Sequence, residues 1–284
     1  MTLQRIWDAL GDETWRAYVD LDSQEHGPLA YDRGLGKGQR EPGYLSSMAK
    51  AHRLVRATLG QRLDLETFEA IHRATLTHTS IGSTFRDAPA WVGVHRDRME
   101  PGIEAVWAAH DAIPDPRSDG RARLRFEPHP PEVMRARIEA GITRMYDAIG
   151  AAASREGRIL AIATFHQSLE LWHPTRDGNT RRHALVLDKL LVEHGETPVI
   201  MTEINDAYVR LPASWARMIL QGMRRWRVVR DAIEGGEDVE ERMHELDREG
   251  VIGRRGARWL RPNQTVFAPG AWEHVAFVED DAEG

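Results

Sequence analysis

Apolar residues recur at helical spacing over most of this sequence, a pattern that constrains the chain to a mainly helical fold. The pattern is clearest on both sides of one short polar segment, residues 173–182. The upstream stripe predicts a helix with a buried face that ends near Trp172, because Pro174 cannot continue it. The downstream stripe begins at Ala184 and closes at Gly195, a residue typical of helix C-caps. The polar segment is therefore a short loop that leads into a helix.

This loop carries groups suited to phosphate chemistry. The amides around Gly178 would open the second helix, where unpaired N–H groups and the helix dipole favour an anion. Asp177 offers a hard oxygen ligand of the kind that holds Mg²⁺. His173 has an ordinary pKa near neutrality and is a natural general base. Arg181 and Arg182 fall in the first helical turn, where the dipole disfavours cations, so a bound polyphosphate would offset their cost.

The loop resembles the core motif of the Fic family, which reads His-x-Phe-x-(Asp/Glu)-Gly-Asn-Gly-Arg-x-x-Arg between two helices. Five of its eight specified positions stand in this sequence, as His173, Asp177, Gly178, Asn179 and Arg181. The other three differ, and the family's Phe, second Gly and last Arg are here Thr175, Thr180 and Ala184. The likeness extends over roughly residues 44–230.

The resemblance implies a transferase that moves AMP, or another nucleotidyl group, from ATP or another nucleoside triphosphate to a hydroxyl of a protein. In that scheme His173 deprotonates the hydroxyl and Asp177 holds Mg²⁺. The nucleotide would be held by residues at the start of the second helix, namely Gly178, Asn179, Thr180, Arg181 and Arg182. Arg182 or His183 would stand in for the missing last Arg.

The three differences leave other activities open. The related Doc proteins also depart at the second Gly and transfer the terminal phosphate, so phosphoryl transfer is one alternative. A relative that binds a nucleotide or a partner protein without turnover is another, and a small-molecule acceptor is a third. A separate interpretation of the residues is a metal centre made by His166, His173 and Asp177, although no fourth ligand stands out.

Residues 82–94 are bounded by Gly and Pro and end in Trp, Val and Val, a composition that predicts a short β-hairpin. In the Fic family such a segment forms a flap that aligns the target by strand addition. The resemblance therefore implies a target-binding flap that includes Phe85, Arg86, Trp91 and Val92. The alternative is a structural hairpin that covers the core.

The sequence divides into three regions. Residues 1–43 are expected to form a helix and a flexible glycine-rich arm, residues 44–235 the Fic-like helical domain, and residues 236–284 a small α+β extension, a cap or a partial winged helix. Within the domain, further helices are predicted over 44–59, 65–76, 133–149 and 207–229, and an extended segment over 197–204.

Composition limits the classes of partner and the cellular location to be expected. The formal net charge of −6 gives no reason to expect nucleic acid, and no apolar run approaches the ~18 residues that span a bilayer. Because the chain has no cysteine, disulfides and thiolate sites are excluded, and a cytoplasmic protein is expected. No Ser/Thr-x-x-x-Glu-(Gly/Asn) string, the family's inhibitory helix, occurs here, so that form of self-inhibition is not predicted. An inhibitory partner or an oligomer stays open.

Overall fold

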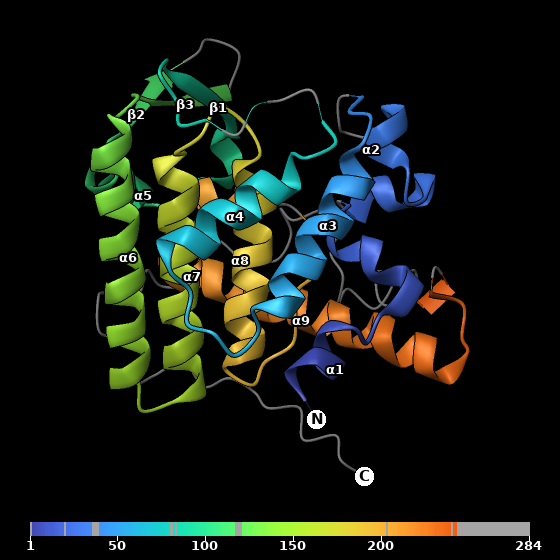
Figure 1. The fold of residues 1–284 in the computed structure, drawn as a ribbon. Helices are drawn as coiled ribbons and strands as arrows, with labels where there is room; N and C mark the ends of the chain where they lie inside the picture. The colour runs from blue at the N-terminus through green and yellow to red at the C-terminus, as the bar shows by residue number, and fades with distance from the viewer. Residues whose placement is uncertain are drawn as a thin grey trace.

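The computed structural model describes residues 2–19, 21–35, 40–79, 82, 84–116, 121–202, 204–239 and 241–242. These residues form a helical bundle with one small antiparallel sheet at one end of it (Figure 1). The mainly helical class predicted from the sequence is confirmed.

Six longer helices make the bundle: α3 (Tyr44–Ala57), α4 (Leu65–Thr75), α6 (Pro131–Ala151), α7 (Arg155–Trp172), α8 (Asn179–Glu193) and α9 (Pro212–Gly235). The shorter elements are α1 (Leu3–Trp7), η1 (Gly11–Ala17), η2 (Leu21–His26), α2 (Ala30–Arg33), η3 (Arg96–Arg98), α5 (Ile103–Ala109) and η4 (Ile204–Tyr208). Helix α7 packs against α6, α8 and α9, and α8 also packs against α3 and α4. The two helices that flank the polar loop are thus central to the bundle.

Local sequence signals set where these helices begin. Asp64 caps α4 by accepting from the Thr67 amide at 2.8 Å, and Ser154 caps α7 by accepting from Gly157. The apolar stripes face the core, as Phe68 and Leu190 show with 0% exposure. Burial of each such side chain stabilises the fold by roughly 1.5–3 kcal/mol. The bundle therefore offers a rigid support for the loop between α7 and α8.

A glycine allows α6 to pack closely on the end of α7. A Cβ at Gly141 would lie 2.8 Å from the ring of Trp172, closer than real Cβ contacts, and 3.2 Å from Phe165, tighter than most of them. Trp172 is the last residue of α7 and precedes the loop. The packing of α6 thus fixes the point from which the polar loop departs.

The sheet has the order β1-β3-β2, from β1 (Ala90–His95), β2 (Ala112–Pro116) and β3 (Arg121–Phe126). Both outer strands are antiparallel to β3, with Val92 opposite Leu124 in one ladder and Ala112 opposite Phe126 in the other. The hairpin predicted within residues 82–94 is therefore wrong. Its second half forms β1, which pairs with β3 instead of with residues just before it in the sequence.

The first half of that predicted hairpin pairs with the polar loop instead. Phe85 bridges Thr175, the Arg86 amide donates to the Pro174 carbonyl at 3.1 Å, and the Arg176 amide donates to Thr84 at 3.2 Å. The loop thus replaces a second strand as the partner of residues 84–86. This pairing ties the loop to the sheet end of the bundle.

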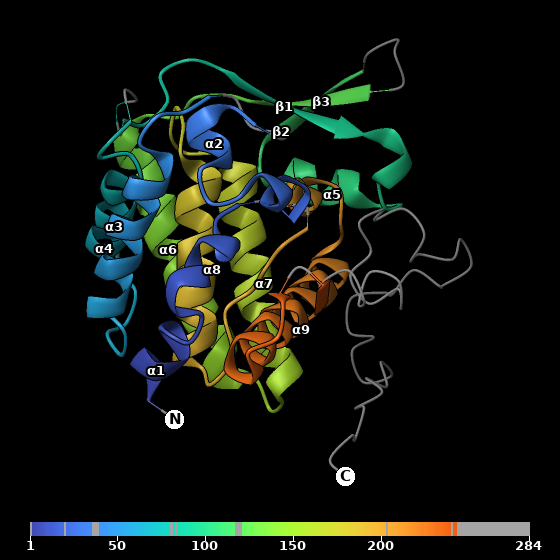
Figure 2. The same cartoon turned by 90° about the vertical axis from the view of Figure 1, so that its right-hand side faces the viewer.

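The N-terminal region differs from the expected flexible arm over the residues described. It runs along the bundle from α1 to α2, which lies at the end that carries the sheet (Figure 2). Trp7 and Ala30 are buried, and the Asp32 carboxylate accepts from the amides of Gly43 and Leu45. The glycine content suggested a linker, but Asp32 supplies the start of α3 with the cap that Gly43 lacks.

The extended segment predicted over 197–204 forms no strand in its described part, which excludes residue 203. Its backbone is held by the bundle, because the Val199 amide donates to Asp188 and the Ile200 amide donates to the Gly222 carbonyl. Most of the predicted C-terminal extension, from residue 243 onward, lies outside the described residues. In the described part of the chain, no helix is both long and apolar enough to cross a membrane.

Candidate active site

The polar loop begins with a strained histidine. His173 is the C-cap of α7 with a φ of +44°, in the left-handed region that side chains rarely adopt. The Arg86 guanidinium holds it there by donating to the His173 carbonyl at 2.5 Å. Strain at a position fixed by surrounding contacts is common at functional sites.

Two side chains fasten the loop to itself. The Asn179 carbonyl oxygen accepts from the Thr175 amide at 3.0 Å and from its hydroxyl at 2.6 Å, while the Asn179 amide donates to the Thr175 carbonyl at 2.8 Å. Both residues are 3% exposed or less. Asn179 was predicted to hold phosphates, but its side chain is committed to the loop. Its partner in these hydrogen bonds is Thr175, which stands where the motif has Phe.

Gly178 is required by the turn into α8. Its φ is +72°, and a Cβ there would lie 3.0 Å from Leu76 and 3.2 Å from His72 Nε2. Helix α8 starts at the next residue, so its first amides have no partner within the helix. Unpaired amides at a helix start are the kind of group that can bind an anion, and here they lie next to Gly178.

A cavity of about 340 Å³ lies in front of this helix start. Its size falls within the range of small-ligand sites. His173, Asp177, Gly178, Asn179, Thr180, Arg181 and Ala184 line one part of it, and Tyr18, Tyr31, Tyr44, Met48, Asp188 and Met201 are among those that line the rest. The structure thus brings the predicted base, metal ligand and phosphate-binding turn to a single cavity, beside aromatic walls.

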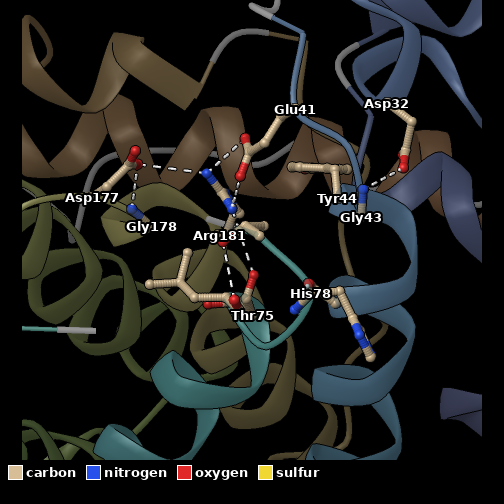
Figure 3. A network of polar contacts seen from close by, with 12 residues as sticks. Asp32, Glu41, Gly43, Tyr44, Thr75, His78, Asp177, Gly178 and Arg181 are labelled. Carbon is tan, nitrogen blue, oxygen red and sulfur yellow. Dashed lines mark hydrogen bonds and ion pairs between the residues drawn. The ribbon is translucent and has the colours of Figure 1, made fainter. Parts of the chain in front are cut away.

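Arg181 is already paired with a carboxylate from the N-terminal region (Figure 3). Its guanidinium nitrogens lie 2.6 and 2.9 Å from the two Glu41 oxygens, and they lie beside the Thr75 carbonyl and Asp177 at 3.5 Å. The ring of Tyr44 lies 5.2 Å from the same cation. Burial, the largest influence, raises the pKa of Glu41, while Arg181 opposes that rise. An incoming phosphate would therefore compete with Glu41 for this arginine.

A tightly packed turn delivers Glu41 to that position. The Glu41 amide donates to the Tyr31 carbonyl at 2.8 Å, and the Gly43 amide donates to Asp32 at 2.8 Å (Figure 3). A Cβ at Gly43 would lie 2.2 Å from the His78 carbonyl oxygen, so no other residue fits there without a shift. The turn is therefore packed closely against the N-terminal region on one side and against His78 on the other.

Asp177 fits the role of a magnesium ligand. Its carboxylate is about half exposed, lines the cavity, and is oriented by the Gly178 amide, which donates to Oδ1 at 2.5 Å. Mg²⁺ is commonly held by one or two carboxylates, substrate phosphates and water, and one carboxylate beside an anion site meets that need.

The alternative three-residue metal centre is wrong. Among the described residues, no group of three or more His, Asp or Glu side chains could hold a metal ion. His166 lies in the core at 1% exposure, where its Nδ1 accepts from the indole N–H of Trp215 at 3.3 Å. It is thus part of the packing between α7 and α9.

His173 is held as a neutral ring. Burial, opposed by the nearby Glu170 charge, lowers the pKa of His173 to about 4. The ring stacks on Phe126 with centroids 5.2 Å apart, and its Nδ1 lies 3.4 Å from the Tyr208 hydroxyl. At neutral pH the imidazole therefore keeps a lone pair, as a general base requires.

Contrary to the prediction, Arg182 and His183 do not reach the cavity. Arg182 is 1% exposed, and its guanidinium carbon lies 4.0 Å from the centroid of the Phe68 ring. His183 is 0% exposed, and the Arg182 Nη2 lies 3.1 Å from its Nε2. Their spacing along α8 turns both side chains into the core, so neither replaces the motif's last Arg.

The predicted flap residues have different environments. Arg86 is 4% exposed and donates to the carbonyls of Phe126 and Glu127, so its side chain anchors the sheet instead of meeting a target. Phe85 lies half-buried at the loop, and Val92 packs on the small core under the sheet. Trp91 is 49% exposed on β1, an outer strand. Of the four, only Trp91 presents a large apolar surface to solvent.

Three residues at the site were not assigned a role there by sequence reasoning. Glu41 comes from the glycine-rich segment, Phe126 from a short strand before a proline-rich stretch, and Tyr208 from a segment predicted as helix. Each meets the loop through tertiary contacts over 35 residues or more, as the His173–Tyr208 pair shows. Glu41 carried one local signal, a carboxylate just before Pro42 and Gly43, the turn residues ahead of a helix.

No protein-family model matches the sequence, and no curated protein matches it. Among solved structures, the chain is similar to the crystal structure of a Fic domain containing signaling protein from Bacteroides thetaiotaomicron. The sequence identity is 11% and the TM-score is 0.48, with 83% of this chain and 97% of that chain covered. The reaction therefore has to be argued from the residues described above.

Proposed function

We propose that this chain is a Fic-like transferase that moves a nucleotidyl group, AMP in the first instance, from a nucleoside triphosphate to a hydroxyl of a protein. The observation that carries the proposal is the convergence of His173, Asp177 and the start of α8 on one cavity. A base, a metal ligand and an anion site are the parts that phosphate transfer needs.

The proposed reaction forms one bond and breaks one. The acceptor oxygen bonds to the α-phosphorus, the bond to the bridging oxygen breaks, and pyrophosphate leaves while His173 takes the hydroxyl proton. The amides at the start of α8 and the Arg181 guanidinium would stabilise the phosphates, and Asp177 would hold Mg²⁺, which neutralises their charge when bound. Thr180 and Ala184 stand at the cavity wall, where they would shape the path of the phosphate chain.

The proposal extends to the acceptor. β1 is an outer strand of the sheet, and the segment before it pairs with the loop that carries His173. A target strand added to β1 would be registered by main-chain hydrogen bonds, with Trp91 as a contact. A protein acceptor is therefore favoured over a small molecule.

One observation favours a second candidate, a nucleotide-binding protein without turnover. Glu41 pairs with Arg181, and Asn179 is committed to the loop, so two motif side chains are already engaged. In this alternative the cavity binds a nucleotide, but the phosphates do not reach the geometry for transfer.

The test uses Mg-ATP labelled at either the α- or the γ-phosphate, with the protein itself and cell lysate as acceptors. Wild type and His173→Ala are compared, with His194→Ala as a matched control on the far end of α8. The proposal expects α-label on protein that depends on His173 but not on His194. Label from the γ-position alone would mean phosphoryl transfer, and binding without transfer of either label would favour the second candidate.

A further inference from the structure

A chain of buried polar groups extends from the rear of His173 into the core. The Tyr208 hydroxyl lies 3.4 Å from His173 Nδ1 and donates to Glu170 Oε2 at 2.9 Å. On the other side of the same carboxylate, His183 Nδ1 lies 3.0 Å from Oε1, and Arg182 Nη2 lies 3.1 Å from His183 Nε2. Tyr208, Glu170, His183 and Arg182 are each 1% exposed or less. None of them lines the cavity in which the reaction is proposed.

In this series of buried polar groups, chemistry decides which group donates and which accepts at each contact. A guanidinium can only donate, so His183 Nε2 accepts from Arg182 and the neutral ring carries its proton on Nδ1, facing Glu170. His183 Nδ1 and Glu170 Oε1 lie 3.0 Å apart but do not meet the geometry of a hydrogen bond. The contact places a protonated ring nitrogen close to the carboxylate.

A second histidine agrees with this direction. An indole N–H can only donate, so His166 Nδ1 accepts from Trp215 and its proton lies on Nε2. That nitrogen is 3.9 Å from Glu170 Oε1. Burial, the largest influence, raises the pKa of Glu170, while the hydrogen bond from Tyr208 and the charge of Arg182 oppose that rise and favour the ionised carboxylate.

Tyr208 connects Glu170 to His173 and sets which of its hydroxyl's donor and acceptor groups faces the loop. Its hydroxyl has one proton, which is used in the bond to Glu170, so its oxygen faces His173 with a lone pair. Two lone pairs would repel each other, and His173 Nδ1 must therefore carry a proton.

We infer that Glu170, through Tyr208, fixes the tautomer of His173 that has its proton on Nδ1 and a free lone pair on Nε2. The inference rests on the proposed function, in which Nε2 takes the proton of the acceptor hydroxyl. Glu170 and Tyr208 are positioning residues, because they act through His173 and do not touch the substrate. Stacking on Phe126 then fixes the plane of the ring, and Tyr208 fixes which nitrogen is the base.

The test is a long-range ¹H–¹⁵N correlation spectrum of the full chain labelled with ¹⁵N-histidine, at neutral pH without nucleotide. The His173 signals are assigned by their loss in His173→Ala. The inference expects wild-type His173 to be protonated at Nδ1 and unprotonated at Nε2. The opposite tautomer in wild type would overturn it, whatever the variants do.

Variants separate positioning from general stability. Tyr208→Phe should lose the single tautomer, whereas Glu170→Gln keeps an acceptor oxygen for the Tyr208 hydroxyl and should retain it. The matched control is Tyr146→Phe, which removes a partly buried tyrosine hydroxyl that accepts from the Leu63 amide at 2.8 Å, away from the site. His72, whose Nε2 lies 2.9 Å from the Asp177 carbonyl, should stay protonated at Nε2 in every variant and so reports an intact loop.

The kinetic readout is the split between kcat and KM. Tyr208→Phe should lower kcat for nucleotide transfer about tenfold or more, in line with the worth of an oriented general base, and leave KM for the nucleotide nearly unchanged. An unchanged tautomer in Tyr208→Phe would overturn the inference. A chain with the expected tautomer but no transferase activity would instead contradict the proposed function, so the two failures are distinguishable.

Discussion

Glu41 offers the sharpest perturbation of the site, because it occupies the arginine that a phosphate would need. Both oxygens of Glu41 contact the Arg181 guanidinium, and the two side chains are only 21% and 11% exposed. Such a pair is worth more than an exposed one, for which the usual value is ~0.2–1 kcal/mol, and less than a fully buried pair, whose disruption costs roughly 3–5 kcal/mol. We therefore place the cost of displacing Glu41 at about 1–2 kcal/mol.

The variant Glu41→Gln keeps the shape of the side chain and removes its charge. If the phosphates of a nucleotide must displace Glu41 from Arg181, this variant should bind Mg-ATP roughly 5–30-fold more tightly, the equivalent of one to two kcal/mol. Isothermal titration calorimetry at fixed ionic strength measures that change. The rate of transfer at low nucleotide concentration should rise by a similar factor.

A matched control is Glu196→Gln, which also removes one carboxylate from an ion pair, that with Arg155 at 2.6 Å. Glu196 is not among the residues that line the cavity, so its loss should leave the affinity for Mg-ATP unchanged. Equal affinity in wild type and Glu41→Gln would refute the competition, and weaker binding in Glu41→Gln would mean that the carboxylate contributes to the nucleotide site.

Three further predictions follow from the geometry. Gly178→Ala should lower the free energy of unfolding by about 1–3 kcal/mol in urea titrations, because the φ of +72° opposes a side chain and the new Cβ would lie 3.0 Å from Leu76. Gly195→Ala, with a φ of +83° and open space around it, should lower the free energy of unfolding by the backbone strain alone. Buried His166 has its pKa lowered to about 4, so the unfolded chain binds a proton between pH 6.5 and 4 that the folded chain does not, and the free energy of unfolding should fall by about 2 kcal/mol from pH 7 to pH 5 for this residue. A flat urea midpoint over that range would contradict the neutral, buried state. Trp91→Ala should raise KM for a protein acceptor severalfold and leave Mg-ATP affinity unchanged, and an equal effect on both would argue against a flap role for β1.

The helices of the bundle could be predicted because their apolar stripes and caps are local. Helix α4 begins at the Asp64 cap, and α8 carries a stripe that is buried in full at Leu190 and Leu191. The position of the loop was also predictable, since Asp177 and Gly178 are neighbours in sequence and directly precede the start of α8.

The sheet was harder to predict because its pairing is not local. β1 pairs with β3, which follows α5 and β2 in the sequence, whereas the composition around Trp91 suggested a local hairpin that does not form. No helix or strand was predicted over residues 103–116, where α5 and β2 form, although Ile103 and Trp107 are buried.

Several residues that line the cavity could be predicted from the sequence, but the residues that support them could not. Spacing gave the right cavity residues at His173 and Arg181, but it assigned Arg182 to the same surface, although one further position along α8 turns a side chain into the core. The contacts from Glu41 and Tyr208 depend on how separate elements pack, and no short-range pattern encodes them.

The most direct test of the account is a crystal structure of the chain with Mg²⁺ and a non-hydrolysable ATP analogue. The account predicts the triphosphate against the amides at the start of α8, with Asp177 at the metal, His173 facing the α-phosphate, and Glu41 displaced from Arg181. Phosphates bound elsewhere, or an intact Glu41–Arg181 pair beside a fully bound triphosphate, would contradict it.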